Sequence, residues 1–545
     1  MFKLENFNKK NIFIFFIIST LTFLLVQLFS YHYRVVSFPF QLEYRESVPL
    51  LIVDALSKGL LPYNIKQLPY YSDLYGIVHP IVTLPFTLFL GNNLVTFKIV
   101  SLLCILFSSA LIFSSLKKIS NSKMTALILT ILFYALCLFQ YTPICRADAL
   151  GLLFFTICLI YPFKHDFSTK SLIIASICSV LAFHTKIYFF IGFPIIVSYI
   201  LLFVSVSKAI KSTLIYLFIF GLTFMINSYL FDYYYIGTFY NQLAASSYEV
   251  LHMLKQTNYY FFYTIPFITI IIVYLTIRFL IISKNKIAFF FTINPEKINL
   301  FKHFNFTNSK NGLLATSVIS YWVYLFILFL FVLTIKMGGH NGNFLLYYIH
   351  LLSIPLIFIS EKFLRTYTKI YSISIGLLIL NIFIIVKILP IKINENHSVN
   401  EYKKIVTIIK KSKSLLSNPI VGSIALSENK KVLNSGLTET FIIGDGFRYS
   451  EKMLKPLAIL KDKIYLKTIN KVKPINDKYL KTINYKVKMH KFDVIFTDTS
   501  IYDDWLISQK ELKLNGYLPV DTFDIHMFAS YQKWRLICWK NIKKK

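Results

Sequence analysis

Charged residues are scarce in this sequence, and acidic residues are the scarcest. Only 15% of the 545 residues are Asp, Glu, Lys or Arg, whereas 56% are hydrophobic and 17% are aromatic. A soluble globular domain has about 25% charged residues. The shortage of charge excludes an ordinary soluble protein, and the long apolar runs predict a polytopic α-helical membrane protein.

Cysteines and nucleotide-binding motifs are also scarce. Gly444–Gly446 lacks the G-x-G-x-x-G context of a phosphate loop and is predicted to form a turn. No internal repeat is present. The six cysteines show no metal or redox spacing, which argues against a disulfide scaffold or a zinc site: Cys104, Cys137, Cys145, Cys158, Cys178 and Cys538.

The net charge of +32 would indicate nucleic-acid binding in a soluble chain. Here the lysines lie in short clusters between apolar spans and in the C-terminal region. This pattern is typical of loops retained in the cytoplasm, followed by a basic extracytoplasmic domain. We therefore expect no nucleic-acid partner.

The first apolar segment, residues 11–30, follows Lys3, Lys9 and Lys10 and can cross a ~30 Å hydrocarbon core. No small-residue cleavage site follows it, so we expect a retained signal anchor. Further spans are expected at 95–116, 124–141, 148–163, 171–185, 187–206, 212–230, 260–282, 312–335, 344–360 and 370–389, about 11 in all. Residues 81–90 are expected to be half-buried.

The distribution of Lys and Arg predicts the orientation. Segments expected inside hold about twice as many of these residues as those expected outside, which places the N-terminus in the cytoplasm. An odd number of spans then exports the C-terminus. We expect a transmembrane domain at 1–390, with an extracytoplasmic loop at 32–94, and a soluble extracytoplasmic α/β domain at 391–545. Strands are expected at 420–426, 441–443 and 492–497.

The first loop, from Gln41 to Pro80, is rich in carboxylates, prolines and tyrosines. Ser47 and Pro49 can begin a short amphipathic helix at the membrane surface, and Gly59 with Pro62 ends it. The loop's candidate reactive groups are Glu43, Glu46, Asp54, Asp73 and His79.

Glu46 is expected at the N-terminus of this helix, where the helix dipole favours an ionised carboxylate. Such a group can act as a general base. Glu43, three residues earlier, is the alternative for this role.

Other ionisable groups gather where spans are expected to end on the outside. Arg146 and Asp148 flank the start of one span, and Lys186 lies at the next outside turn. A further turn, residues 336–343, contains three glycines with Lys336 and His340. All of these could contact a phosphate. An Arg146–Asp148 ion pair, a snorkelling Lys186 and a plain glycine turn are the structural alternatives.

These segments resemble GT-C membrane glycosyltransferases, the family of protein O-mannosyltransferases and aminoarabinose transferases. The first loop is similar in its acidic residue, glycine, aromatic and Tyr/Pro pattern; R-x-D-x-L at 146–150, Thr185–Lys186 and the 336–344 turn are similar too. Two features depart from the family: Glu43 and Glu46 replace an Asp-Glu pair, and His79 replaces a lysine. The matching loop residues are Glu46, Gly59, Pro62, Tyr63, Tyr75, Gly76 and Pro80.

The resemblance implies an inverting glycosyltransferase that takes a sugar from a polyprenyl-phosphate donor. Glu46 or Glu43 would be catalytic. Contacts to the donor are assigned to His79, Arg146, Asp148, Lys186, Lys336, His340, Tyr63 and Tyr75.

The expected partners are this donor, membrane lipids and an envelope lipid, glycan or protein acceptor, and the expected location is the bacterial inner membrane. No metal site is assigned, and a divalent cation stays open as a cofactor. The alternatives are a transporter or flippase, or a polymerase or ligase, of lipid-linked glycans.

Overall fold

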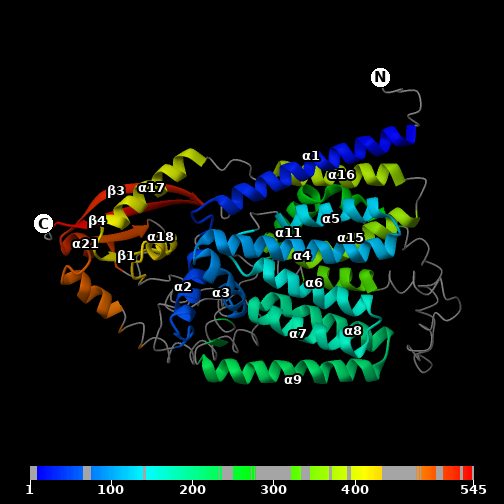
Figure 1. Cartoon of the computed structure of the whole chain (residues 1–545), viewed down its shortest axis with the longest axis horizontal. Coiled ribbons are helices and arrows are strands. Elements are labelled where there is room, and N and C mark those ends of the chain that lie inside the picture. Colours follow the sequence, from blue (N-terminus) through cyan, green and yellow to red (C-terminus); the bar gives the residue numbers. More distant parts are fainter. Residues whose placement is uncertain are drawn as a thin grey trace.

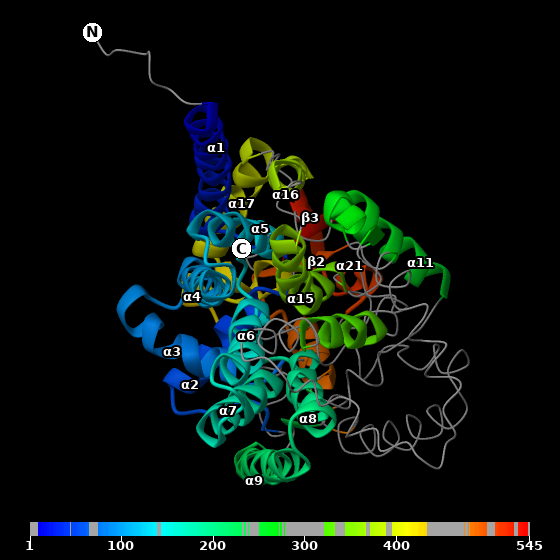
Figure 2. The same ribbon diagram turned by 90° about the vertical axis from the view of Figure 1, so that its right-hand side faces the viewer.

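The computed structural model is a bundle of long helices with a small β-sheet at one end (Figures 1 and 2). Helices α2 and α3 lie between the bundle and the sheet, and α1 begins at the end of the bundle away from the sheet (Figure 1). The structure describes residues 9–43, 45–64, 75–138, 143–231, 234–235, 238, 250–271, 273–274, 277, 321–332, 344–366, 371–388, 395–432, 474, 478, 480–498, 507–527 and 532–542.

The long helices of the bundle coincide with most of the apolar runs of the sequence. They are α1 (Lys9–Ser37), α4 (Leu94–Ser120), α5 (Lys123–Leu138), α6 (Asp148–Lys164), α7 (Thr169–Thr185), α8 (Gly192–Phe203), α9 (Val206–Leu230), α15 (Phe344–Thr366) and α16 (Tyr371–Ile388). The shorter elements are α2 (Ser47–Ser57), α3 (Val78–Leu90), η4 (Ile187–Ile191), α11 (Val250–Asn258) and η6 (Tyr259–Thr264). Helix α5 is central, because it packs against α1, α4, α15 and α16.

Polar caps set where several helices begin. The Asn93 side chain accepts from the Thr96 amide at 3.0 Å at the start of α4, and Ser205 caps α9 in the same way. Asn121 ends α4 in the left-handed conformation, a common way to end a helix.

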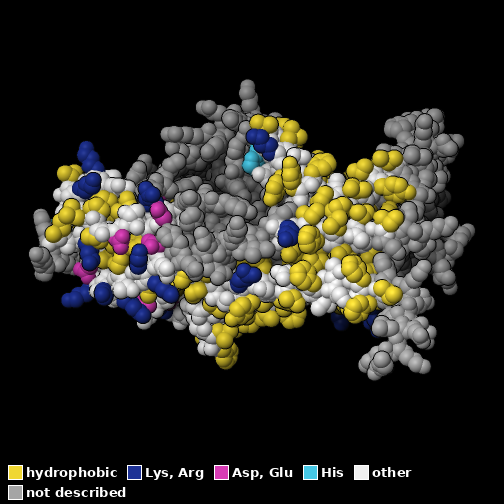
Figure 3. Space-filling model, turned by 90° about the horizontal axis from the view of Figure 1, so that it is seen from above, with side chains coloured by type: hydrophobic (Ala, Val, Ile, Leu, Met, Phe, Trp, Pro, Cys, Tyr) yellow, Lys and Arg dark blue, Asp and Glu magenta, His cyan; other side chains and the backbone are white. Residues whose placement is uncertain are grey.

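Within the described residues, α4, α9 and the segment Ile14–Ser37 of α1 are long and apolar enough to cross a membrane. Shorter apolar helices, among them α5, α7 and α16, accompany them. Helix α9 is only 11% buried over its most apolar stretch. Hydrophobic side chains dominate the bundle half of the surface, whereas charged groups of both signs gather over the sheet (Figure 3). An apolar surface of this kind fits contact with lipid.

The C-terminal sheet has the strand order β1-β2-β4-β3. β1 (Leu415–Leu416) is parallel to β2 (Val494–Asp498), and the pairs β2·β4 and β4·β3 are antiparallel, with β4 at Gln532–Asn541 and β3 at Tyr517–Met527. Helix α17 (Glu395–Lys411) contacts β3. Helix α21 (Gln509–Leu514) begins with a Ser508–Glu511 capping box. The strand expected at 492–497 is confirmed as β2, and the strand expected at 441–443 lies outside the described residues.

The strand expected at 420–426 is wrong. The chain forms η9 (Pro419–Val421) and then α18 (Gly422–Ser427). Asn418 accepts from the Ile420 amide at 2.7 Å and turns the backbone into the helical conformation. A short buried apolar run has no periodicity that separates helix from strand, which explains the error.

The helix expected at the start of the first loop is confirmed as α2, and Gly59 follows it with φ +68°. Its apolar side does not face lipid, as an amphipathic helix at the membrane surface would. Eight of its 11 residues are buried, and it packs against α3, η9 and α18. The apolar side chains that suggested a lipid-facing helix therefore pack against protein.

We predict that the bundle end next to the sheet is extracytoplasmic. The excess of Lys and Arg at the opposite end supports this orientation. A phosphatase fused after Lys545 should be active in intact cells, and a fluorescent protein that matures only in the cytoplasm should be dark there. The reverse pattern would place the first loop on the cytoplasmic side.

Candidate active site

The Glu46 carboxylate fastens the first loop to the segment before α6. Its Oε1 accepts from the Cys145 amide at 2.7 Å, and its Oε2 accepts from the amides of Leu42 and, at 3.1 Å, Glu43. The Cys145 thiol donates to the Glu46 carbonyl at 3.2 Å. The Glu46 side chain is 0% exposed. Backbone donors therefore hold both oxygens, an arrangement that fixes the loop.

Lys98 holds the same loop from the membrane side. Its buried ammonium, at the second turn of α4, donates to the carbonyls of Phe38 at 2.8 Å and Phe40 at 3.1 Å. It also lies 5.6 Å from the centre of the Phe38 ring. A buried cation needs such partners, so the chain leaving α1 is held at a defined place.

A second group of charges lies beside this anchor, and we call it the charge cluster: Glu43, Arg45, Arg146, Asp148 and Lys186. Four of these side chains are buried, and Arg45 is half-buried. Lys186 lies 2.7 Å from Asp148 Oδ1, and Arg146 Nε lies 3.4 Å from Asp148 Oδ2. Arg146 and Arg45 each approach Glu43 Oε1 to 3.9 Å. Counted over these five described residues, three cations and two carboxylates leave one excess positive charge.

Tyr75 closes the charge cluster. Its hydroxyl contacts Arg146 and accepts from Arg45 Nη1 at 3.3 Å, and the Lys186 ammonium lies 4.3 Å from its ring centre. Burial raises the pKa of the Tyr75 phenol, but three neighbouring cations, Arg146 foremost, lower it, and the net pKa falls from 10.0 to about 8. The site thus stabilises a negatively charged oxygen at the position of this phenol.

Gly76 and Tyr63 place Tyr75 over Lys186. The Gly76 amide donates to the Thr185 carbonyl at 3.2 Å, and a Cβ on Gly76 would overlap the backbone carbonyl of His184. The Tyr63 hydroxyl donates to the carbonyl of Tyr75. Only glycine permits this close approach between the loop and the end of α7.

Of the residues predicted to contact the donor, the structure brings Tyr75, Arg146, Asp148 and Lys186 together around Glu43. His79 is buried on α3, within electrostatic reach of Asp148, and its Nε2 has no hydrogen-bond partner among the described residues.

Of the other predicted residues, Lys186 and Asp54 can be compared with the expectation. The Lys186 ammonium is buried at Asp148, so it does not snorkel to the interface. Asp54 lies away from the charge cluster and pairs with Lys58 at 2.6 Å. Lys336, His340 and Asp73 lie outside the described residues.

Three residues near the site were not predicted from the sequence. Arg45 joins the charge cluster, Lys98 anchors the first loop, and His350 on α15 is buried within electrostatic reach of Asp148 and Lys186. Lys98 and His350 lie inside otherwise apolar helices. The cost of an ionisable group in a membrane helix was the signal that could have found them.

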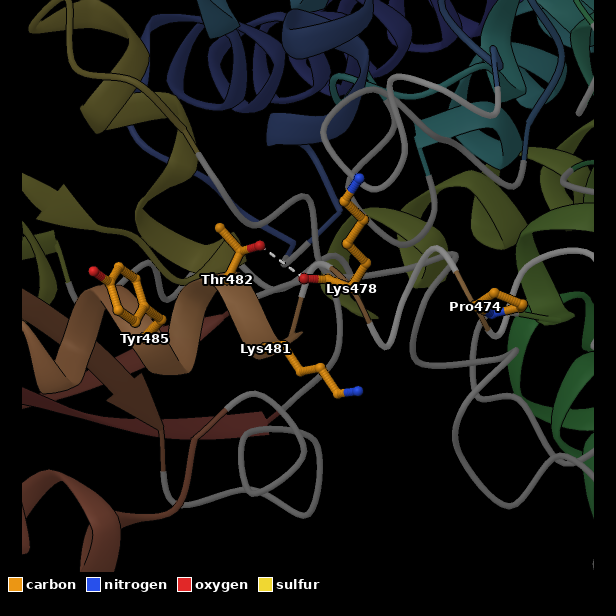
Figure 4. Close-up of a pocket in the computed structure, with 5 residues that line it drawn as sticks. All are labelled: Pro474, Lys478, Lys481, Thr482 and Tyr485. Carbon is orange, nitrogen blue, oxygen red and sulfur yellow. Dashed lines mark hydrogen bonds between the residues drawn. The ribbon is translucent and has the colours of Figure 1, made fainter.

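A groove of about 580 Å³ lies on the C-terminal part of the chain (Figure 4). The five described residues that line it include no carboxylate and no histidine: Pro474, Lys478, Lys481, Thr482 and Tyr485. None belongs to the charge cluster. Across the described residues, no group of three or more His, Cys, Asp or Glu is arranged to hold a metal ion.

No family model matches this sequence. No curated protein matches it either. In structure, the chain is similar to ArnT from Cupriavidus metallidurans bound to undecaprenyl phosphate, with a TM-score of 0.54 at 8% identity, over 96% of this chain and 98% of that chain. The apo state of that ArnT gives a TM-score of 0.48 at 10% identity, over 96% of this chain and 97% of that chain.

At this level of identity the similarity to ArnT shows the fold. The chain is an integral membrane protein of the helical class. Its fold is that of ArnT, so the predicted GT-C fold is confirmed as a fold.

We predict that Gly76→Ala displaces Tyr75 from the charge cluster. The added Cβ meets backbone, which cannot move aside as a flexible side chain would. The variant should unfold at a lower temperature than the wild type in a thermal melt in detergent. Gly221→Ala, where a Cβ on α9 meets nothing within 4 Å, is the control and should be neutral or slightly stabilising. Equal melting temperatures for the wild type and Gly76→Ala would contradict the close approach.

Proposed function

We propose that the protein transfers a sugar from a polyprenyl-phosphate donor to an acceptor hydroxyl at the sheet end of the bundle. The observation that carries the proposal is the charge cluster at that end of the bundle, whose five described residues carry one more positive than negative charge. The fold shared with ArnT supports it.

The charge balance suits a phosphate. A phosphodiester that joins a lipid to a sugar carries one negative charge, which would neutralise the excess positive charge of the cluster. Buried charges are costly unless they are paired, so an anion is the ligand that the cluster favours. When the sugar leaves, the phosphate gains a second negative charge, and Arg146 and Lys186 would stabilise it.

Glu43 is the better general base of the two carboxylates. Both Glu46 oxygens accept hydrogen bonds from backbone amides, whereas Glu43 Oε1 has no hydrogen-bond partner within the described part of the chain. Glu43 also lies next to Arg146, where the phosphate is placed. A base must be able to reach the acceptor hydroxyl, and an oxygen without a hydrogen bond can do so.

The reaction follows from these positions. Glu43 takes the proton of the acceptor hydroxyl while that oxygen forms a bond to the anomeric carbon. The bond between the anomeric carbon and the phosphate oxygen breaks, and the phosphate keeps the electron pair. Attack opposite the leaving group inverts the anomeric centre. Glu46 and Lys98 are positioning residues, because they hold the loop that carries Glu43.

The proposal predicts that the purified protein in lipid nanodiscs releases polyprenyl phosphate from a polyprenyl-phosphate sugar when an acceptor is present. Mass spectrometry of lipid-linked sugars and envelope glycans from cells with and without the gene would identify the sugar and acceptor to supply. A transporter or flippase would move the lipid-linked sugar without releasing polyprenyl phosphate. A ligase or polymerase would transfer a whole glycan from its carrier.

We predict that replacing Glu43 and replacing Glu46 by glutamine affect turnover and stability differently. Glu43→Gln should lower turnover by roughly 10² to 10⁴ in protein that still folds, because it removes the proton acceptor. Its melting temperature should also fall, because the charge cluster loses one of its two carboxylates. Glu46→Gln should mainly lower the melting temperature, because an amide cannot accept from three backbone donors through both of its ends. Activity in Glu43→Gln, together with a stable but inactive Glu46→Gln, would assign the base to Glu46.

A further inference from the structure

His350 is a buried histidine with no protein partner, beside the charge cluster. It lies six residues into α15, about 9 Å along the axis at 1.5 Å per residue. Its side chain is 0% exposed. Neither ring nitrogen has a hydrogen-bond partner among the described residues, and the same holds for Ser353 Oγ, one turn further on.

Packing connects His350 to the cluster. Its ring stacks on Phe189 of η4, with the ring centres 6.2 Å apart. The Phe189 amide donates to the Lys186 carbonyl at 3.0 Å. The Phe189 ring also covers Gly151, one turn after Asp148, where a Cβ would overlap it. His350 therefore lies one side chain away from the two residues that form the closest ion pair of the cluster.

Such a group needs a ligand. A buried polar atom that makes no hydrogen bond loses its contact with water and gains nothing in return. Two other buried histidines, His32 and His184, are paired: His32 contacts Tyr134, and His184 bonds Tyr234 at 3.0 Å and Thr223 at 3.2 Å. His79 on α3 lacks a partner at Nε2 alone among the described residues. His350 differs from them in that the folded chain supplies no partner among the described residues.

We propose that His350 donates a hydrogen bond to a phosphate oxygen of the lipid donor, and to the same phosphate after the sugar has left. The inference rests on the proposed function and adds a contact from α15 to those from Arg146 and Lys186. Phosphate is favoured over a sugar hydroxyl because the His350 ring stacks on Phe189, whose amide bonds the carbonyl of Lys186, one of the two cations proposed to hold the phosphate. A neutral imidazole donates through one nitrogen, so it adds no charge to the cluster.

The test separates binding from stability. His350→Phe removes both nitrogens and keeps an aromatic ring against Phe189. It should weaken binding of undecaprenyl phosphate about tenfold, because a hydrogen bond to a charged group is lost. The melting temperature of the ligand-free variant should be unchanged or higher. His350→Gln keeps a donor and should bind within about threefold of the wild type. His350→Leu is a second control, because the phenyl ring of His350→Phe is larger than imidazole and could act sterically.

His32→Phe is the matched control, since its histidine has a partner and lies in α1. It should lower the melting temperature and leave lipid binding unchanged. Undecaprenyl phosphate binding to nanodisc-embedded protein, measured by native mass spectrometry, provides the readout.

The outcomes separate the two proposals. Equal binding by the wild type and His350→Phe would overturn the role of His350 and leave the proposed function standing. A lower melting temperature for both His350→Phe and His350→Leu without ligand would also overturn it, because the imidazole would then have a partner in the chain. No binding by the wild type would instead contradict the polyprenyl-phosphate donor, and the role of His350 would fall with it.

Discussion

The need to pair one buried carboxylate shapes the site. Asp148 is 1% exposed at the start of an apolar helix, and an ion there is stable only if cations come to it. Lys186 reaches it from the end of α7, and Arg146 reaches it from two residues away. Because both cations are brought to one point, Tyr75 and Glu43 gather around them. The charge cluster therefore follows from the burial of the Asp148 carboxylate.

Two carboxylates three residues apart have different surroundings for a structural reason. Glu46 precedes α2, and its oxygens accept from two amides just before it in the chain, those of Leu42 and Glu43, and from the Cys145 amide of the segment before α6. Glu43 turns toward the arginines. Glu46 holds the loop in place, so the loop does not rely on Glu43 Oε1 for a hydrogen bond. Glu43 is therefore the carboxylate that can react. Glu43 Oε2 accepts from the Arg45 amide at 2.9 Å, so Oε1 is the oxygen left to take a proton.

The sequence was sufficient for features that depend on local chemistry. Long apolar runs predicted the helices from α4 to α9, Gly59 marked the end of α2, and the cost of buried charge pointed to Arg146 and Asp148. Features that depend on distant segments could not be predicted. The Cys145 amide that donates to Glu46 Oε1 lies 99 residues away in the chain. The helix α18 that covers α2 comes from the C-terminal part, so a buried helix was taken for a surface one.

The C-terminal part of the chain takes part in shaping the first loop. Tyr402 of α17 stacks on Phe40 with the ring centres 4.4 Å apart, and its hydroxyl donates to the Gln41 carbonyl at 3.2 Å. Ser423 of α18 donates to the Gln41 side chain at 3.0 Å. Gln41 lies two residues before Glu43, so these contacts and the Lys98 anchor fix the same short segment from opposite sides. Movement of the sheet relative to the bundle would therefore strain the loop that carries Glu43, and its position depends on both parts being in place.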